Sequence, residues 1–395
     1  MSKMMTRHVY TSESVSEGHP DKVCDQISDA ILDACLANDS AAHVACETAV
    51  GSNLVVNVGE ITCKNWDRIN PGKIARDVVQ DIGYDTPSEG FSFDTFNYVC
   101  ALHGQSVDIA RGVNKVKPED QGAGDQGMMF GYASNATRQL MPAPIIFSHS
   151  LLQFFTTLRK NGEIAYLRPD SKAQVSVLHE NGEAKEITAV VISHQTREVP
   201  ITRIRKELEE AARAFLKDTG MLTNKTKFYI NPTGRFVVGG PCGDSGVTGR
   251  KIIVDTYGGV GSHGGGAFSG KDPSKVDRSA AYMARYVAKN IVAAKLAKRC
   301  EVQLAYAIGY PDPVSVHVET FGTGAVSDDK IAKAVRAVFG LKPAEIVKQL
   351  NLLRPIYSLT DQYGHFGRKA GDKNFKFFTW EQTDKAAALV KAVAK

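Results

Sequence analysis

Glycine is concentrated in one segment of the chain, residues 239–270, which holds 12 of the 35 glycines within 32 positions. A flexible linker is one interpretation of such a segment. It also contains "RKIIVDTYGG" (250–259), however, which predicts a buried strand, and basic residues stand at its edges. Glycine lets the backbone approach a ligand closely and point N–H groups at an anion, while Lys and Arg neutralise the anion's oxygens. We therefore expect a loop that binds a polyphosphate.

The end of this segment also resembles a phosphate-binding P-loop. From Gly265 the chain reads G-x-x-x-x-G-K, which ends at Gly270-Lys271. A P-loop needs Ser or Thr next, a strand directly before it and a helix directly after it. Here Asp272 follows, and residues 260–276 separate the predicted strand from the next predicted helix. A P-loop-like ATP-dependent phosphotransferase is therefore the alternative hypothesis, and a different kind of cradle is the favoured one.

The distribution of charge favours a small anion over a nucleic acid. The net charge is +5, while residues 250–299 alone carry +7, so the rest of the chain is slightly acidic. A nucleic-acid-binding protein usually presents a broad basic face. An RNA-binding protein is therefore the weaker, non-enzymatic alternative, and we expect no nucleic-acid partner.

No segment of the sequence predicts export or membrane insertion. The longest apolar stretch, 144–158, is interrupted by Ser148, His149 and Gln153 and is too polar to span a bilayer. No apolar run follows a charged start at the N-terminus. The seven cysteines lack C-x-x-C spacing, which is typical of reduced thiols in the cytosol. We expect a cytoplasmic protein without a membrane partner.

Helical and strand patterns alternate, and several strands form hairpins rather than βαβ units. Val23, Ile27 and Ile31 repeat at helical spacing behind Pro20, which suits a first helical position. Asn181-Gly182 between two strand patterns predicts a type I′ hairpin turn. This order predicts the α+β class. The expected helices are 20–37, 201–217 and 277–299, and the expected strands are 42–50, 54–62, 173–180, 183–193, 227–240, 300–309 and 314–322.

Four stretches resemble signatures of the S-adenosylmethionine synthetase family, also called methionine adenosyltransferases. They are "SESVSEGHPDK" (12–22), "GAGDQG" (122–127), "INPTGRF" (230–236) and "GGGAFSGKDPSKVDRSAAY" (264–282), and the resemblance continues to "YGHFGR" (363–368). It implies three α+β domains of similar βαββαβ-type topology about a pseudo-threefold axis. We place these domains at 1–107, 121–239 and 240–395, with a mobile lid or linker at 108–120.

The resemblance also implies the reaction. The sulfur of methionine attacks C5′ of ATP and expels the whole triphosphate, which is then hydrolysed to phosphate and diphosphate. A thioether sulfur is nucleophilic without a base, so catalysis rests on alignment and on stabilising the charge that develops on the triphosphate. The family builds its site between subunits of a homo-oligomer, dimer or tetramer, which places His19 and Lys172 on different chains.

Catalytic and ATP-binding positions follow from the same resemblance. His19 would lie at the bridging oxygen between C5′ and the α-phosphate, and Lys172, Arg250 and Lys271 would hold phosphate oxygens. Arg235 and Phe236 would lie near adenine. The ATP-binding set is His19, Asp170, Ser171, Lys172, Arg235, Phe236, Asp244, Arg250, Lys251, Ala267 and Lys271.

The metal and methionine positions are assigned in the same way. Asp21 and Asp277 would hold two Mg²⁺ ions and Glu47 one K⁺ ion. By residue type alone, the two aspartates are equally suited to helix starts. The methionine-binding set is Glu60, Gln105, Asp244 and Lys275.

Two departures from the family pattern are visible. In the expected lid, 105–115, Val107 stands where proline is usual and Arg111 where glutamine is usual, which affects the stiffness of the lid rather than the chemistry. The stretch 103–127 by itself is typical of either a lid or a plain linker. Residues 367–385 are longer than in the usual bacterial form, and we expect a surface insertion there.

Overall fold

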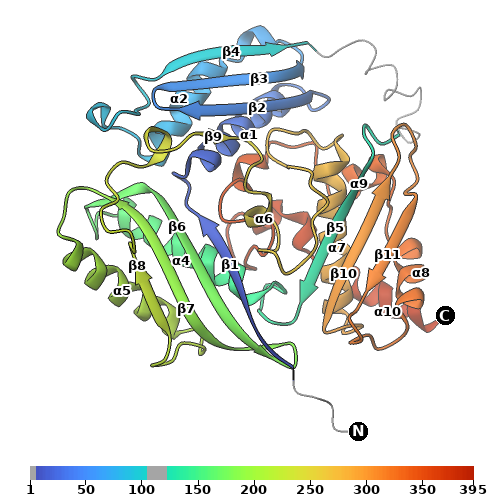
Figure 1. Ribbon diagram of the computed structural model, residues 1–395. Coiled ribbons are helices and arrows are strands. Elements are labelled where there is room, and N and C mark those ends of the chain that lie inside the picture. Colours follow the sequence, from blue (N-terminus) through green and yellow to red (C-terminus); the bar gives the residue numbers. More distant parts are fainter. Residues whose placement is uncertain (1–5, 105–121) are drawn as a thin grey trace.

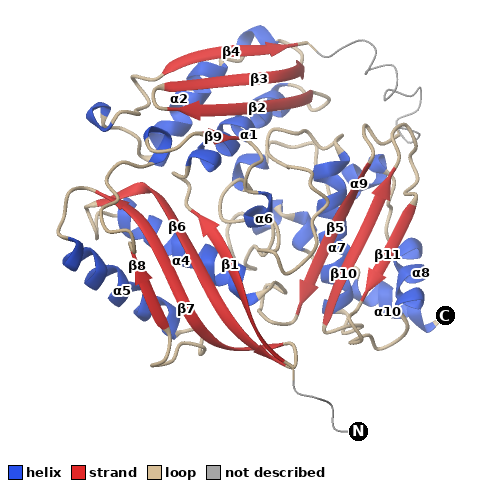
Figure 2. Ribbon diagram, viewed as in Figure 1, coloured by secondary structure: helices blue, strands red, loops and turns tan. Residues whose placement is uncertain are grey.

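The computed structural model describes residues 6–104 and 122–395, and it is built from three β-sheets surrounded by helices (Figures 1 and 2). The strand orders are β1-β6-β7-β8, β4-β3-β2-β9 and β11-β10-β5. Figure 1 shows these sheets set around a central region in which the short helix α6 lies. The α+β class expected from the sequence is confirmed.

The same order of elements occurs three times along the chain. A leading strand is followed by a helix, a β-hairpin and a second helix, and in the first two units by a closing strand. The first unit is β1 (Arg7–Val15), α1 (Pro20–Asn38), β2 (His43–Gly51), β3 (Leu54–Thr62), α2 (Pro71–Ile82) and β4 (Asn97–His103). The second is β5 (Gly127–Ser134), α4 (Ala143–Lys160), β6 (Leu167–Glu180), β7 (Glu183–Thr196), α5 (Ile201–Lys217) and β8 (Lys227–Ile230). The third is β9 (Gly246–Val247), α6 (Ile252–Asp255), α7 (Val276–Ala293), β10 (Arg299–Tyr306), β11 (Ser315–Glu319) and α8 (Asp328–Val338), followed by α9 (Pro343–Gln349) and α10 (Ala386–Ala394).

Each unit lends its leading strand to the sheet of the next unit. β1 pairs antiparallel with β6 of the second unit, β5 with β10 of the third, and β9 with β2 of the first. The exchange is therefore cyclic, and each borrowed strand lies beside the first strand of a hairpin. Every sheet thus combines strands from two of the three ranges that we expect as domains. The domain boundaries themselves, 1–107, 121–239 and 240–395, stay a prediction.

Local sequence signals explain most helix ends and turns. Pro20 occupies the first turn of α1, and the side chain of His19 caps this helix. Asn181 and Gly182 have φ values of 51° and 81°, which a type I′ turn requires, so the predicted hairpin is confirmed. Helix 201–217 and strands 42–50 and 54–62 are also confirmed, to within a residue.

Several expected elements are wrong in extent or type. The strands expected at 173–180, 300–309 and 314–322 extend over Leu167–Glu180, Arg299–Tyr306 and Ser315–Glu319, and three other elements differ more. Residues 250–259 form the short helix α6 and a turn instead of a strand, and Gly258 and Gly259 have positive φ values of 63° and 85° that no strand can contain. Strand 227–240 ends at Ile230, because Asn231 turns the chain with φ 39°. Helix 277–299 ends at Ala293, since Lys295 adopts φ 58°.

The helix α7 forms the centre of the third unit and is buried almost all round. It packs so closely against β5 that a Cβ on Gly131 would lie 1.9 Å from the carbonyl oxygen of Ala284. Glycine is therefore required there by close approach of two backbones. Among the described residues, we find no helix that combines the length and the apolarity needed to cross a bilayer.

The stretch 367–385 is more than the surface insertion that the sequence suggested. Phe378, Trp380 and Glu381 are buried, and Trp380 stacks on Tyr282 of α7. Glu381 accepts hydrogen bonds from Arg285. Exposed residues are concentrated in 369–373, and Lys376, Thr383 and Asp384 are exposed as well. The expectation therefore holds for the loop 369–373 and is wrong for the buried residues that follow it.

Candidate active site

His19 ends the loop between β1 and α1 and is 3 % exposed. Its Nδ1 accepts a hydrogen bond of 3.1 Å from the backbone N–H of Asp21. Burial and the charges of Lys251 and Lys172 together lower the pKa of His19 to about 3, although the charge of Asp21 opposes the shift. The imidazole is therefore neutral, and because Nδ1 is an acceptor, its proton lies on Nε2, which is a hydrogen-bond donor.

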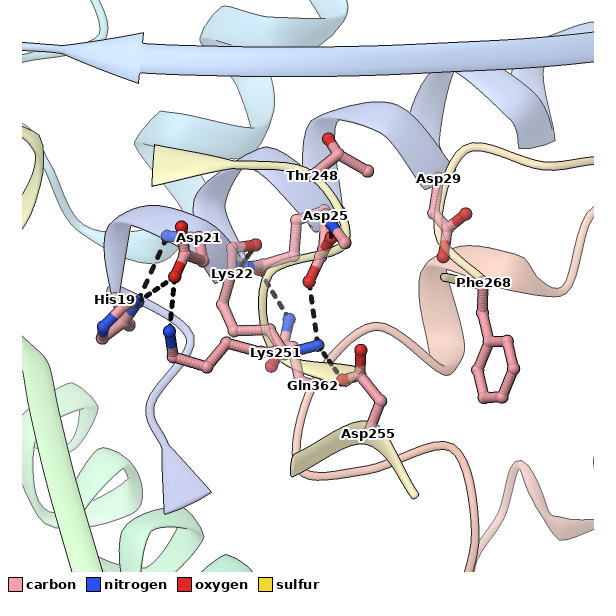
Figure 3. Close-up of polar contacts among 12 residues, drawn as sticks. His19, Asp21, Lys22, Asp25, Asp29, Thr248, Lys251, Asp255, Phe268 and Gln362 are labelled. Atoms are coloured by element: carbon pink, nitrogen blue, oxygen red, sulfur yellow. Dashed lines mark hydrogen bonds and ion pairs between the residues drawn. The ribbon is translucent and has the colours of Figure 1, made fainter. Parts of the chain in front are cut away.

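Asp21 and Lys251 form the polar side of this site (Figure 3). Lys251 Nζ lies 2.5 Å from Asp21 Oδ2, the N–H of Val247 donates to Asp21 Oδ1 at 3.0 Å, and Arg250 Nε lies 3.9 Å from Asp21 Oδ1. Burial alone would raise the pKa of the Asp21 carboxyl, but the hydrogen bonds from Lys251 and Val247 outweigh it and hold the pKa below its usual value. The result is an ionised carboxylate between two cations.

Residues 170–172 of β6 lie next to His19 in the same chain. Lys172 is paired with Val15 in the β1–β6 register, and the N–H of Ser16 donates to the carbonyl of Ser171 at 2.9 Å. The expectation that His19 and Lys172 come from different chains is therefore wrong, because strand β1 carries His19 to the edge of the sheet that contains β6.

Asp170 is the most buried acid of this strand end. Its Oδ2 accepts a hydrogen bond of 2.9 Å from the N–H of Gly240. Burial raises the pKa of Asp170 to about 6, although the hydrogen bond from Gly240 and the charge of Lys172 oppose the shift. We call His19, Asp21, Asp170, Lys172, Arg250 and Lys251 the His19 group. Asp244, also expected at the site, is exposed on the loop that follows Gly240.

Arg235 and Phe236 line an open pocket of about 470 Å³ beside the His19 group. The N–H of Thr196 at the end of β7 donates to the carbonyl of Phe236 at 2.9 Å, and the Gln195 side chain donates to the Val237 carbonyl at 3.0 Å. The Arg235 side chain lies on the surface, where it pairs with Glu198 at 2.8 Å. The pocket offers an aromatic ring and a cation at its rim.

The glycine-rich loop forms a second basic group before α7. Lys271 Nζ lies 2.6 Å from Asp277 Oδ2, and both side chains are about one quarter exposed. A Cβ on Gly266 would lie 2.3 Å from Asp277 Oδ1, and one on Gly264 would lie 1.6 Å from the Met128 carbonyl oxygen of β5. These two glycines therefore let the loop lie flat on β5 and on the Asp277 carboxylate.

His263 lies in the same loop. Its Nδ1 accepts a hydrogen bond of 2.8 Å from the N–H of Gly265. Burial lowers its pKa, and Asp277 opposes the shift. We call His263, Lys271, Lys275 and Asp277 the Lys271 group. Ala267, expected to contact ATP, is half-buried in this loop.

Asp272 explains why this loop is not a P-loop. It is buried, accepts a hydrogen bond of 2.7 Å from the N–H of Val44, and pairs with Lys275 Nζ at 2.5 Å. The side chain therefore fastens the loop to β2 and does not face a metal. Helix α7 starts only at Val276, and α6 takes the place of the preceding strand. The P-loop hypothesis fails in both respects.

Four aspartates at a spacing of four residues along α1 hold other segments by their backbone N–H groups. Asp21 binds Val247, Asp25 binds Gly249 at 2.9 Å, Asp29 binds Gly270 at 2.8 Å, and Asp33 binds Tyr357 and Ser358 at 2.9 and 2.8 Å. The backbone N–H groups of Gly249 and Gly270, which the sequence suggested for binding an anion, therefore donate to carboxylates of α1. The four-residue spacing of the aspartates can be seen in the sequence. The residues that donate to them cannot, because they are more than two hundred positions away.

Two buried cations complete this arrangement, and sequence reasoning missed both. Lys22 lies between Asp25 and Asp255, and so ties α1 to α6 (Figure 3). Arg278 makes a two-pronged ion pair with Asp29 at 2.7 and 2.9 Å and also donates to the carbonyl oxygens of Phe268 and Lys271. Both residues lie inside the quoted signature stretches, next to Asp21 and Asp277.

The His19 group and the Lys271 group lie beside different parts of strand β2. Val247 beside the His19 group is paired with Ala49, whereas Lys271 is paired with Ala45. Four residues of a strand separate these backbones by about 13 Å. Glu60 is paired with Ala45 and therefore lies at the Lys271 end. Gln105 falls outside the described residues.

Glu47 lies on the face of β2 that points away from α1. Val44, Cys46, Thr48 and Val50 alternate with it and are buried. On the same face Leu54, Val58 and Val99 are 41 %, 41 % and 48 % exposed. An apolar patch on a sheet face is typical of a protein–protein contact.

The donors present fit magnesium better than a transition metal. The described residues contain no cluster of three or more His, Cys, Asp or Glu side chains that could enclose an ion. Mg²⁺ is usually held by one or two carboxylates together with phosphates and waters. Asp21 and Asp277 are each single carboxylates beside lysines, and each oxygen keeps a lone pair beyond its present hydrogen bond.

Comparison with known proteins gives consistent matches over the whole chain. Models of S-adenosylmethionine synthetase match as the N-terminal domain over residues 7–107, the central domain over 120–236 and the C-terminal domain over 238–382. An S-adenosylmethionine synthase of Treponema denticola is 56 % identical over 390 residues, which cover 97 % of this chain and 98 % of that protein.

Proposed function

Since the chain belongs to the S-adenosylmethionine synthetase family and is a methionine adenosyltransferase, we propose that its two basic groups hold the triphosphate of one ATP molecule between two subunits. The enzyme forms S-adenosylmethionine from ATP and L-methionine. The observation that carries the proposal is the neutral His19, whose Nδ1 is held by the Asp21 N–H and whose ring lies close to the charges of Lys251 and Lys172.

The first step is a displacement at carbon. The sulfur of methionine attacks C5′, the C5′–O bond breaks, and the electron pair leaves with the triphosphate. His19 donates its Nε2–H to the bridging oxygen as charge develops there, while Lys172, Arg250 and Lys251 hold the phosphate oxygens. Preorganised donors of this kind supply much of the rate enhancement in such reactions. Arg235 and Phe236 border the adenine. Asp170 accepts a hydrogen bond from the nucleoside, and the Ser171 hydroxyl can donate or accept one.

The Lys271 group belongs to the partner's half of the site. One chain places it about 13 Å along β2 from the His19 group. The exposed apolar face of the same sheet, with Leu54, Val58 and Val99, suits a second copy of this chain. A homo-oligomer would then bring Lys271, Asp277 and Ala267 of one chain to the phosphates held by His19 of the other. The same contact would unite the methionine residues Glu60, Gln105 and Lys275 with Asp244.

Metal ions would assist the same residues. We propose Asp21 and Asp277 for two Mg²⁺ ions and Glu47 for one K⁺ ion; when bound, the ions neutralise oxygens of the triphosphate. We also propose that the enzyme is cytoplasmic and that no nucleic acid or membrane takes part. The lid predicted at 108–120 lies outside the described residues and stays a prediction. After the first step the bound triphosphate is hydrolysed to phosphate and diphosphate.

The direct test is product analysis. The enzyme is incubated with ATP, methionine, Mg²⁺ and K⁺, and the products are separated by chromatography. The expected products are S-adenosylmethionine, phosphate and diphosphate, formed only when methionine is present. ADP as the main nucleoside product would instead support a phosphotransferase, and salt-sensitive RNA binding without phosphate release would support the RNA-binding alternative.

Replacing Asp21 by asparagine should weaken the dependence on magnesium. The amide keeps an acceptor for the N–H of Val247 but loses the charge that binds Lys251 and a metal. We expect the Mg²⁺ concentration for half-maximal activity to rise by about tenfold or more, since a charge-assisted contact is lost. A magnesium titration of the initial rate measures this, and an unchanged midpoint would mean that Asp21 only fastens α1 to Val247.

The pH dependence should reveal Asp170. Its pKa is raised to about 6 by burial, so its carboxylate becomes protonated as the pH falls through 6. Because the charged form is the better acceptor, kcat/KM for ATP should fall below this pH, to roughly one tenth at pH 5. His19 is already neutral there and contributes nothing to this limb. An Asp170→Asn variant should not show this fall in kcat/KM below pH 6. If the fall persists in that variant, it arises from the titration of another group.

A further inference from the structure

His263 shares its local geometry with His19. In both, Nδ1 accepts the backbone N–H of the residue two positions ahead, Asp21 at 3.1 Å and Gly265 at 2.8 Å. In both, the proton of the neutral ring therefore lies on Nε2 and points away from the turn. Both histidines also lie in the loop that precedes a long buried helix, His19 before α1 and His263 between α6 and α7.

The surroundings of His263 are those of the Lys271 group. It lines a small cavity together with Gly264, Gly266 and Asp277, and Lys271 binds the same aspartate. The His263 ring lies against Phe268, with centroids 6.3 Å apart. Within the described chain, we find no residue that accepts a hydrogen bond from its Nε2. The Nε2–H donor is thus held in place near Asp277, the ion-pair partner of Lys271, and has no acceptor among the described residues.

We infer that His263 is a second phosphate-binding histidine, which donates its Nε2–H to the end of the triphosphate that lies at the Lys271 group. This inference rests on the proposed role of that group. His19 would hold the oxygen next to C5′, and His263 of the partner's half would hold the far end. Its main effect would fall on the triphosphate after the C5′–O bond has broken, because that intermediate is held only by phosphate contacts.

Two substitutions of His263 separate the loss of its Nε2–H donor from the loss of the turn that its Nδ1 holds. Asparagine at 263 keeps an oxygen that accepts the Gly265 N–H, as in an Asx turn, but it is too short to replace Nε2–H. Glutamine carries an amide N–H at about the distance of Nε2 along the side chain. His317, exposed on β11, provides a histidine outside the site for a matched His317→Ala control.

The experiment measures binding of inorganic tripolyphosphate with Mg²⁺ by calorimetry, together with its hydrolysis and with S-adenosylmethionine formation. His263→Asn should bind tripolyphosphate about tenfold or more weakly, because a hydrogen bond to a charged group is lost. His263→Gln should recover part of this loss, and His317→Ala should behave as the unmodified enzyme. Lys271→Ala serves as the positive control for loss of binding.

The outcomes are distinguishable from failure of the proposed function. If the unmodified enzyme forms no S-adenosylmethionine, the proposed function itself fails. If it does, and His263→Asn binds tripolyphosphate normally, the inference is overturned while the function stands. If the glutamine variant recovers none of the binding lost in the asparagine variant, the Nε2–H is not the group that binds the phosphate, and the donor role is likewise overturned.

Discussion

Replacing His19 by asparagine is expected to slow S-adenosylmethionine formation by about 10²–10³-fold in kcat, the usual cost of removing one preorganised donor from a developing negative charge. The His19 ring is buried, neutral and oriented by the N–H of Asp21, so its Nε2–H needs no rearrangement during the reaction. KM for ATP should change much less than kcat, because the donor acts on charge that appears only as the C5′–O bond breaks.

Asparagine is a suitable replacement because it separates catalysis from folding. It is a strong N-cap residue and keeps an acceptor at the start of α1, so the thermal unfolding midpoint should stay close to that of the unmodified enzyme. Single-turnover measurement of S-adenosylmethionine formation reports the chemical step itself. If the His19→Asn variant retains more than a tenth of the single-turnover rate, His19 does not take part in the chemical step.

Replacing Arg278 by methionine is expected to lower the free energy of unfolding by about 3–5 kcal/mol, the range found when one partner of a buried ion pair is removed. Arg278 is fully buried, and its loss would strand the carboxylate of Asp29 in the interior. The carbonyl oxygens of Phe268 and Lys271 would lose the same donor, so the loop that carries the Lys271 group should loosen.

A double variant tests this explanation. Asp29→Asn removes the stranded charge and keeps an acceptor for the N–H of Gly270. Combined with Arg278→Met, it should recover a substantial part of the lost stability, although tripolyphosphate binding should stay weak. Urea unfolding at one fixed protein concentration measures both variants, since an oligomer's stability depends on concentration. A double variant that is less stable than Arg278→Met alone would show that the ion pair is not the cause.

Much of the candidate site was predictable from short stretches of sequence. The His19–Asp21 stretch, the Asp170–Lys172 stretch and the loop from Gly264 to Asp277 are continuous, so their residue types and order can be recognised directly. The structure brings the first two together, along with Arg250 and Lys251, in the His19 group. Their roles in the reaction stay predictions.

The buried ion pairs were not predictable in the same way. Lys22 and Arg278 look like surface residues in the first turns of two helices, because charged side chains are seldom fully buried. Their partners, Asp255 and Asp29, lie 233 and 249 positions away. Only the tertiary structure shows that these charges join α1 to α6 and to α7 on either side of the glycine-rich loop.

Sequence alone determined the α+β class, the hairpin at Asn181-Gly182 and helices α1 and α5 of this protein, because periodicity, caps and turn residues act over a few neighbouring positions. Tertiary structure decided the cyclic exchange of β1, β5 and β9, the short helix α6 in place of a strand, and the placing of His19 and Lys172 in one chain. These features depend on pairing between residues far apart along the chain. The energy of such pairing comes from contacts and hydrogen bonds that no local pattern records.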